Sequence, residues 1–474
     1  MKKYIKYILL LFLLLSSVFA LYYITKINIL RDYALISSYI LVIVLFLLIS
    51  FILLKKRIKP VFKIIFGILT IILVIAYSFV SVYANNTINF INNITTIKYE
   101  LTHYSVMTLK ENELDSIDDL KDKKLGFIKD DSHKKEVNRL LSNKIKYTSE
   151  EYDEIGSLIG HLYEKNIDAL VINESYISLL EESDSTFIND YIELYSFDIK
   201  VDKKDETVSK TNLSEPFIFY ISGTDSRYGV SSVARSDVNI IAVVNPKVNK
   251  ILLVTTPRDY YVQLHDTYGL KDKLTHAGVY GINKSVETMQ DIYSIKIDNY
   301  IKVSFSTVVN LVNAIDGIDV NSDLEFSRIA ENTTERCSYT LGANHLNGIC
   351  ALTYARERKY YSTGDRHRGQ NQQEVITAIV NKLSNPKYLI RYNSILDAIN
   401  GTIETNFTYE QITEFVKYEL SNMKKWDVES ISVDGTGAML PTYSMGSNLP
   451  LYVMIPDENT ISIAKEKINE YLNY

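Results

Sequence analysis

Three long apolar runs without charge constrain the fold of this chain more than any other feature. They span Tyr7 to Thr25, Tyr33 to Leu54 and Ile64 to Tyr83. Each run is long enough to cross about 30 Å of hydrocarbon as a helix. Lysine and arginine gather before the first run and between the second and the third, so the positive-inside rule places those flanks in the cytoplasm. Residues 1–83 are therefore predicted to be three transmembrane helices, with the chain beyond about Ala84 outside the cytoplasm.

The first run has an alternative interpretation. The stretch SSVFA, with Val18 and Ala20 as its small residues, fits a signal-peptidase site. Two spans would still follow that cleavage, so the later residues remain extracytoplasmic in either case. A third interpretation, three core helices of a soluble protein, is the weakest because the runs are so long and uncharged.

Composition limits the classes of partner and the redox chemistry. The chain has 474 residues, enough for two or three domains, and a formal net charge of −6. No overall basic field favours nucleic acid, and the basic loops on the cytoplasmic side are only a few residues long. The two cysteines are too few for a disulfide scaffold, and no His/Cys spacing predicts zinc.

Beyond the membrane, strand-like and helix-like segments alternate, which predicts two α/β units. In the first, KLGFIKD and IDALVINES read as strands, and HKKEVNRLLSNK and YDEIGSLIGHLYEKN read as helices. The charge-dense stretch KVDKKDETVSKTNLSE separates the first unit from the second. The predicted divisions are a stalk at 84–97, an accessory α/β domain at 98–212, a larger α/β domain at 213–434, and a C-terminal segment packed on it at 435–474.

The larger domain is predicted to hold a mixed central sheet flanked by helices on both faces. Its clearest element is VNIIAVVNPKVNKILLVTTPRD, in which two β-branched runs flank the turn NPKVNK and form a hairpin. The stretch VESISVDG reads as a late strand, and apolar periodicity in GINKSVETMQDIY, FSTVVNLVNAI, QQEVITAIVNKL and EQITEFVKYELSNM predicts helices.

Charged side chains of the larger domain follow strands or open helices, which is where ligands gather in α/β sheets. Several fork-shaped guanidinium groups together with carboxylates suit a pyrophosphate with a hard divalent cation. Helix N-termini also favour phosphate. In this interpretation Asp225 and Asp237 lie beside a metal, and Arg227 and Arg235 point at phosphates. The further members of the set are Arg258, Asp259, Arg356, Arg358, Arg368 and Gln372.

The region from about Pro216 to Val433 resembles the LytR–CpsA–Psr family. The matching pieces, in chain order, are SGTDSR, ARSDVNIIAVVNP, TPRD, KLTHAGVYG, AIDGIDV, LNGICALTYARER and DRHRGQNQQ. The three spans, the accessory domain and the tail LPLYVMIPDENTISIAKEKI are similar to capsule-type, CpsA-like members. The sequence RGQNQQ departs from the GRxxRQQ of many relatives and leaves the roles of Arg366 and Gln373 open.

The resemblance implies a magnesium-dependent (or manganese-dependent) phosphotransferase. Such an enzyme moves a capsular polysaccharide or teichoic acid from undecaprenyl pyrophosphate onto a MurNAc of peptidoglycan, and capsule-biosynthesis proteins are possible partners. The family's metal-binding acids fall on Asp225 and Asp237. Its pyrophosphate-binding residues fall on Arg235, Arg258, Arg356, Arg358, Arg368 and Gln372.

The residues leave three questions open. Asp237 or Asp259 could accept the proton of the attacking hydroxyl, with Arg258 beside them. A hydrolase acting on polyprenyl pyrophosphate would use the same groups with water as the acceptor. A non-catalytic scaffold or regulator of capsule biosynthesis would bind the carrier without chemistry.

Three other features have simpler expected roles. His276 is expected to be a packed or surface histidine rather than a catalytic one. The helix around Val308 to Ile315 is a candidate wall for a polyprenyl chain, although ordinary core packing is the stronger explanation for any one of its residues. Cys337 and Cys350 lie thirteen residues apart outside the membrane, so a disulfide between them is expected.

Overall fold

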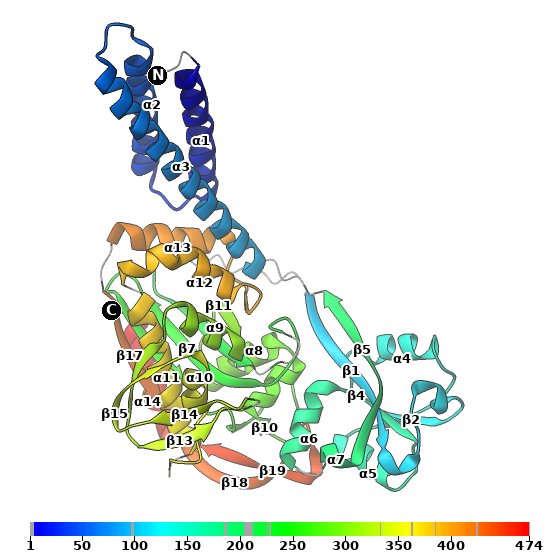
Figure 1. The fold of residues 1–474 in the computed structure, drawn as a ribbon. Coiled ribbons are helices and arrows are strands. Elements are labelled where there is room, and N and C mark those ends of the chain that lie inside the picture. The colour runs from blue at the N-terminus through cyan, green and yellow to red at the C-terminus, as the bar shows by residue number, and fades with distance from the viewer. Residues whose placement is uncertain are drawn as a thin grey trace.

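The computed structural model has three parts: a helical bundle, a large α/β domain and a smaller accessory α/β domain (Figure 1). It describes residues 4–95, 99–183, 187–202, 212–224, 226, 229–331, 333–361, 364–383, 385–422 and 425–473. The mixed α/β class predicted from the sequence is confirmed in both domains.

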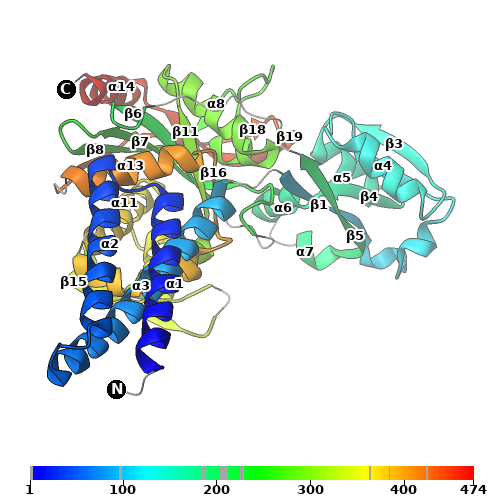
Figure 2. The same cartoon turned by 90° about the horizontal axis from the view of Figure 1, so that it is seen from above.

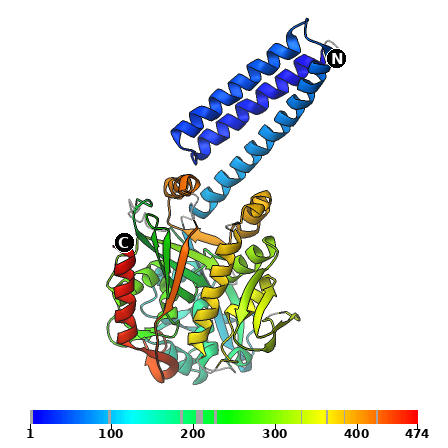
Figure 3. The same ribbon diagram turned by 90° about the vertical axis from the view of Figure 1, so that its left-hand side faces the viewer.

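The three apolar runs form α1 (Ile5–Ile27), α2 (Asp32–Leu54) and α3 (Pro60–Thr95), each long and apolar enough to cross a membrane. Helix α3 does not end where its apolar run ends, because residues 84–95 contain no glycine or proline. Ala84, Ile88 and Ile91 lie on one buried face of this extension. The segment expected as a stalk is thus a helix, and α3 runs unbroken from the bundle to the large domain (Figure 3).

The accessory domain is a five-stranded sheet with the strand order β3-β2-β4-β1-β5. Its strands are β1 (Tyr99–Leu109), β2 (Lys124–Ile128), β3 (Thr148–Tyr152), β4 (Ala169–Asn173) and β5 (Tyr191–Asp202). Its helices are α4 (Lys134–Ser142), α5 (Ile155–Tyr163), α6 (Ile177–Ser183) and α7 (Phe187–Asp190). One apolar cluster lies on each face of the sheet, which explains why β4 is buried along its whole length.

The large domain is built on a six-stranded mixed sheet with the order β16-β11-β6-β7-β8-β17 among the described residues. Strands β6, β7 and β8 are antiparallel neighbours, and β11 and β17 pair parallel to β6 and β8. The strands are β6 (Phe217–Thr224), β7 (Ser236–Asn245), β8 (Lys250–Thr255), β11 (Asn299–Ser304), β16 (Ile403–Thr405) and β17 (Asp427–Ser432). The predicted hairpin is confirmed as β7 and β8, with Asn245 opposite Lys250.

Helices cover both faces of this sheet, as predicted. On one face, α8 (Ile282–Tyr293) and α14 (Glu458–Leu472) share a core with β6, β7 and β8. On the other face, α11 (Asp365–Leu383) and α13 (Tyr409–Asn422) pack against the sheet. Beside them lie α9 (Phe305–Ala314), α10 (Gly348–Ala355) and α12 (Tyr392–Ile399).

The C-terminal segment packs on both domains rather than on the large domain alone. Strands β18 (Gly435–Thr442) and β19 (Gly446–Pro456) form a hairpin whose Met445 and Leu451 enter an apolar cluster of the accessory domain. Viewed from above, β18 and β19 lie between the large sheet and the accessory domain (Figure 2). The hairpin therefore joins the two domains through a shared core.

A close approach of α10 to α9 depends on the absence of a side chain at Gly348. A Cβ there would lie 2.1 Å from the Val309 carbonyl oxygen. We expect Gly348→Ala to lower the stability of the large domain by about 1–3 kcal/mol, because backbone must move to admit the methyl group. The measurement is thermal unfolding of the full chain in detergent.

Gly160→Ala is the matched control, since Gly160 is also helical but a Cβ there has nothing within 4 Å. That exchange should raise stability by about 0.5–1 kcal/mol. Equal melting temperatures for the two variants would contradict the close approach.

Candidate active site

Asp237 lies near the start of β7, where a buried polar network fixes the strand. The Tyr220 hydroxyl donates a hydrogen bond to Asn239 Oδ1 (2.6 Å) and lies 2.9 Å from Ser236 Oγ. Because these partners come from neighbouring strands, the backbone is held where the chain returns from the loop after β6. The side chain of Asp237 therefore extends from the fixed N-terminal end of a central strand.

Arg258, just after β8, is the direct partner of Asp237. Its Nη1 donates to Asp237 Oδ1 (3.0 Å), and the Thr275 hydroxyl donates to the same oxygen (3.2 Å). Asp237 and Arg258 are only 9% and 11% exposed. Burial acts to raise the pKa of this carboxyl, but the guanidinium groups of Arg258, Arg235 and Arg368 hold the pKa well below its usual range. Asp237 is therefore a carboxylate at neutral pH.

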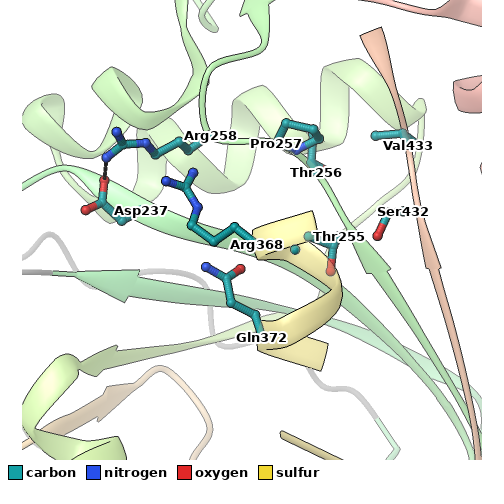
Figure 4. A pocket seen from close by; sticks show the side chains of 10 residues that line it. Asp237, Thr255, Thr256, Pro257, Arg258, Arg368, Gln372, Ser432 and Val433 are labelled. Atoms are coloured by element: carbon teal, nitrogen blue, oxygen red, sulfur yellow. Dashed lines mark hydrogen bonds and ion pairs between the residues drawn. The ribbon is translucent and has the colours of Figure 1, made fainter. Parts of the chain in front are cut away.

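Helix α11 brings two more predicted residues to the same place. Arg368 and Gln372, one turn apart, extend from it toward the carboxylate (Figure 4). The helix is anchored by Gln373, whose Nε2 donates to Thr255 Oγ1 (2.8 Å) and to the Ile431 carbonyl (2.7 Å). The open role of Gln373 is thus filled structurally, because it attaches α11 to β8 and β17.

Arg356 and its neighbours form another part of the same site. The Arg356 guanidinium lies 4.5 Å from the centre of the Phe305 ring. Glu331 bridges two arginines, with Oε2 3.0 Å from Arg356 Nη2 and Oε1 2.8 Å from Arg328 Nη2. Arg328 Nη1 also donates to the buried carboxylate of Glu357 (2.9 Å). A carboxylate thus already occupies an anion position between two guanidinium groups.

These groups line one cavity of about 170 Å³. Six cationic side chains face two carboxylates there, so the cavity has a positive surplus that suits a multiply charged anion. An adjoining cavity of about 130 Å³ shares Phe305, Arg328, Glu331 and Arg356 and adds Ile349, Leu352 and Thr353 of α10. The lining residues of the first cavity are Asp237, Arg258, Phe305, Arg328, Glu331, Arg356, Arg358, Lys359, Arg368 and Gln372.

The structure thus brings together most of the predicted set: Asp237, Arg258, Arg356, Arg358, Arg368 and Gln372. Arg235 precedes β7 and acts electrostatically on Asp237. Asp225 and Arg227 lie outside the described residues, and so does the side chain of Arg366.

Asp259 does not line this cavity. Its carboxylate lies 2.5 Å from Nζ of Lys273, and both side chains are buried. Burial acts to raise the pKa of Asp259, but Lys273, Arg258 and Arg368 lower it below the ordinary range. A buried, paired carboxylate with a lowered pKa is a weak base, and the same holds for Asp237.

Sequence reasoning missed Arg328, Lys359, Phe305 and Glu331, which all line the cavity. Lys359 directly follows the predicted Arg358 in YARERK, so its position in the sequence could have indicated that it belongs to the site. Arg328 and Glu331 belong to the hairpin of β13 (Phe326–Ile329) and β14 (Arg336–Tyr339). No local pattern in that stretch indicates that it folds over the arginine cavity.

Cys337 and Cys350 form a disulfide, with Cα atoms 5.4 Å apart. It connects β14 with α10, the helix that leads into Arg356. The bond therefore ties the hairpin that carries Arg328 and Glu331 to the segment that carries the predicted arginine pair.

His276 is a packed histidine. Its Nδ1 lies 2.6 Å from Asp272 Oδ1 and 2.8 Å from Ser444 Oγ, and its side chain is fully buried. Because Ser444 belongs to the turn of the β18–β19 hairpin, the contact joins that hairpin to the large domain. The structure gives His276 a structural role.

Comparison with known proteins adds a second line of evidence. Residues 188–458 match the LytR_cpsA_psr family, a range that includes every strand of the large sheet. The chain is similar to a polyisoprenyl-teichoic acid–peptidoglycan teichoic acid transferase TagU of Bacillus mycoides, with 32% identity over 242 residues, 50% of this chain and 76% of that protein. The TagU protein of Enterococcus faecalis is 32% identical over 248 residues, covering 50% and 79%. The crystal structure of B. subtilis TagV is 27% identical with a TM-score of 0.45, over 55% of this chain and 98% of that one.

Glu331 competes with any anion that approaches Arg328 and Arg356. We expect Glu331→Gln to tighten binding of inorganic pyrophosphate by about two- to tenfold, because the ligand no longer displaces a carboxylate. Calorimetric titration of the full chain in detergent measures this effect.

Glu335→Gln is the matched control, since it removes the same charge from the same hairpin while its carboxylate accepts from Asn347 Nδ2 (2.7 Å). Equal tightening in the two variants would show a general charge effect and contradict the competition.

Proposed function

Since the chain belongs to the LytR–CpsA–Psr family, we propose that it transfers a glycopolymer from a polyprenyl pyrophosphate carrier onto peptidoglycan. The observation that carries this proposal is the cavity lined by six cationic side chains together with the ionised Asp237. Phosphoryl transfer depends mainly on positioning and charge neutralisation, which such a cavity supplies.

The chemistry is a displacement at phosphorus. A MurNAc hydroxyl attacks the phosphorus attached to the polymer, and a new P–O bond forms. The bond between the two phosphates breaks, undecaprenyl phosphate leaves, and the proton of the hydroxyl passes to the released phosphate, whose second pKa of about 6 makes it a stronger base than Asp237 or Asp259. Arg258 and Arg368 would hold the phosphate oxygens from one side, and Arg356 and Arg358 from the other.

A hard divalent cation fits the residues that are described. Asp237 is ionised and takes part of its hydrogen bonding from Thr275, while the cavity lies open to it on the other side. Mg²⁺ is commonly held by one or two carboxylates together with substrate phosphates. Asp237 with Asp225 would hold Mg²⁺ or Mn²⁺, which would neutralise charge developing on the phosphates.

The lipid end of the carrier is proposed to enter through the adjoining cavity. Ile349, Leu352 and the Phe305 ring give that cavity apolar walls next to Arg356. Val312 of α9 and Ile315, directly after it, are buried in the core. The helix proposed as a wall therefore lines the cavity with its first residue, Phe305, rather than with its later apolar residues.

Two features support an extracytoplasmic site on a membrane anchor. The charge flanks of the three apolar helices support a location of the large domain outside the cytoplasm by the positive-inside rule. The disulfide between Cys337 and Cys350 belongs to an oxidising compartment. The polymer is proposed to be a teichoic acid, as named for the relatives, or a capsular polysaccharide.

The decisive experiment gives the full chain in detergent a labelled saccharide on polyprenyl pyrophosphate and soluble peptidoglycan strands. We expect label on peptidoglycan, loss of transfer with a chelator, and recovery with Mg²⁺ or Mn²⁺. Asp237→Asn should lower transfer by at least about 100-fold, since it removes the carboxylate that would hold the divalent cation and that pairs with Arg258.

Asp319→Asn is the control, because Asp319 is an exposed carboxylate paired with His345 (2.6 Å) away from the cavity. Release of saccharide without label on peptidoglycan would establish a hydrolase instead. Carrier binding with no turnover would establish a scaffold.

The pH dependence follows from the lowered pKa of Asp237. Folding favours the ionised form of Asp237. Its stabilising contribution to the folded protein is therefore present at pH values above the ordinary carboxyl pKa, and it is lost only as the pH falls below that pKa. We expect kcat/KM to show no step from this group between about pH 5 and 8. A step in that window that disappears in Asp237→Asn would contradict the assignment.

A further inference from the structure

The loop between β6 and β7 is attached to the accessory domain. Its returning limb, residues 229–235, lies beside the start of β1. The Leu101 amide donates to the Ser231 carbonyl (3.0 Å), and the Val233 amide donates to the Leu101 carbonyl (2.9 Å). Leu101 and Ser232 thus form a parallel β-bridge between the two domains.

A series of hydrogen-bonded side chains holds the limb at the same residue, Ser232. His103 Nε2 lies 3.1 Å from Ser232 Oγ, and His103 Nδ1 lies 2.5 Å from Asp198 Oδ1 on β5. Asp, His and Ser are connected in the order of a hydrolytic triad. The Ser232 side chain has no exposed surface, however, so it cannot reach a substrate. This chain of contacts can therefore act only by holding the limb.

Further contacts hold the limb from its other sides. Lys302 Nζ donates to the Ser232 carbonyl (2.8 Å), and Ser175 Oγ donates to the Val233 carbonyl (2.8 Å). A Cβ on Gly278 would lie 2.5 Å from the Ala234 carbonyl oxygen, so the large domain also packs closely against the limb. The backbone just before Arg235 is fixed jointly by both domains.

The limb leads directly into the proposed catalytic site. Arg235 is its last residue, and Asp237 follows two positions later at the edge of the cavity. A change in the path of residues 231–233 must shift Arg235, because the intervening backbone is too short to absorb it.

We propose that the accessory domain positions the catalytic loop, and that His103 is the positioning residue through which it acts. The expected effect on the transfer reaction rests on the proposed function, whereas the expected effect on the structure of the loop does not. His103 touches no substrate. It fixes Ser232, and Ser232 fixes the approach of Arg235 to the phosphates. The accessory domain thereby contributes to catalysis by positioning Arg235.

The test compares His103→Ala, His103→Gln, Ser232→Ala and the double variant His103→Ala/Ser232→Ala in the full chain in detergent. Amide hydrogen exchange of peptides covering 229–238 gives a readout that needs no substrate. We expect about tenfold faster exchange there in His103→Ala, from loss of a buried hydrogen-bond partner. His103→Gln should recover most of the protection, because its amide reaches Ser232.

The kinetic arm uses the transfer reaction described above. We expect kcat to fall about tenfold in His103→Ala with little change in KM, since a mispositioned arginine affects the transition state more than ground-state binding. The double variant should be no worse than His103→Ala, because both changes remove one interaction.

His265→Ala is the matched control, since it removes another histidine–aspartate pair (2.8 Å to Asp291) from the large domain. Equal behaviour of His103→Ala and His265→Ala would overturn the proposal. So would faster exchange throughout the accessory sheet together with a silent Ser232→Ala, since His103 would then only stabilise its own domain. If the unmodified protein shows no transfer, the proposed function fails, while the exchange arm still decides whether His103 holds the loop.

Discussion

The buried pair of Asp237 and Arg258 is the interaction on which the site depends. A carboxylate removed from water is costly unless a partner compensates it, and here Arg258 provides that partner between the edges of β7 and β8. The arginines that follow α10 and the arginine on α11 then exceed the acids around them. The protein keeps this surplus of positive charge in a partly enclosed cavity, so the arrangement is electrostatically complete only with an anion bound.

Local patterns in the sequence were sufficient for much of the fold. The apolar runs, the β7–β8 hairpin and α11 all carry strong periodicity or turn signals, and they place Asp237, Arg258 and Arg368 at strand ends and a helix start. The remaining features depend on contacts between distant segments. Lys273 neutralises Asp259 from across a loop, and Arg328 enters the cavity from a hairpin about thirty residues before Arg358.

The contact between the two domains likewise could not be predicted from local sequence patterns. The charge-dense stretch KVDKKDETVSKTNLSE predicts a division between two α/β units, but it contains no information on how they contact each other. The contact arises from β1 pairing with the limb at Ser232 and from Met445 of the C-terminal hairpin entering the accessory core. Segments from three regions of the chain meet there, so the two domains and the tail are best regarded as one folded unit.

The unbroken helix α3 has a consequence for how reactants meet. At about 1.5 Å per residue its 36 residues extend about 54 Å, well beyond the roughly 30 Å of a hydrocarbon core. In the C-terminal part of α3, Thr87 and Asn93 form hydrogen bonds with Tyr392 and Asn400 of the large domain. These contacts restrict rotation of the domain relative to the helix. Its cavity stays at one height above the lipid surface. Under the proposed function, a donor confined to the leaflet would reach the enzyme by lateral diffusion in two dimensions, while the acceptor polymer would have to come to that fixed plane.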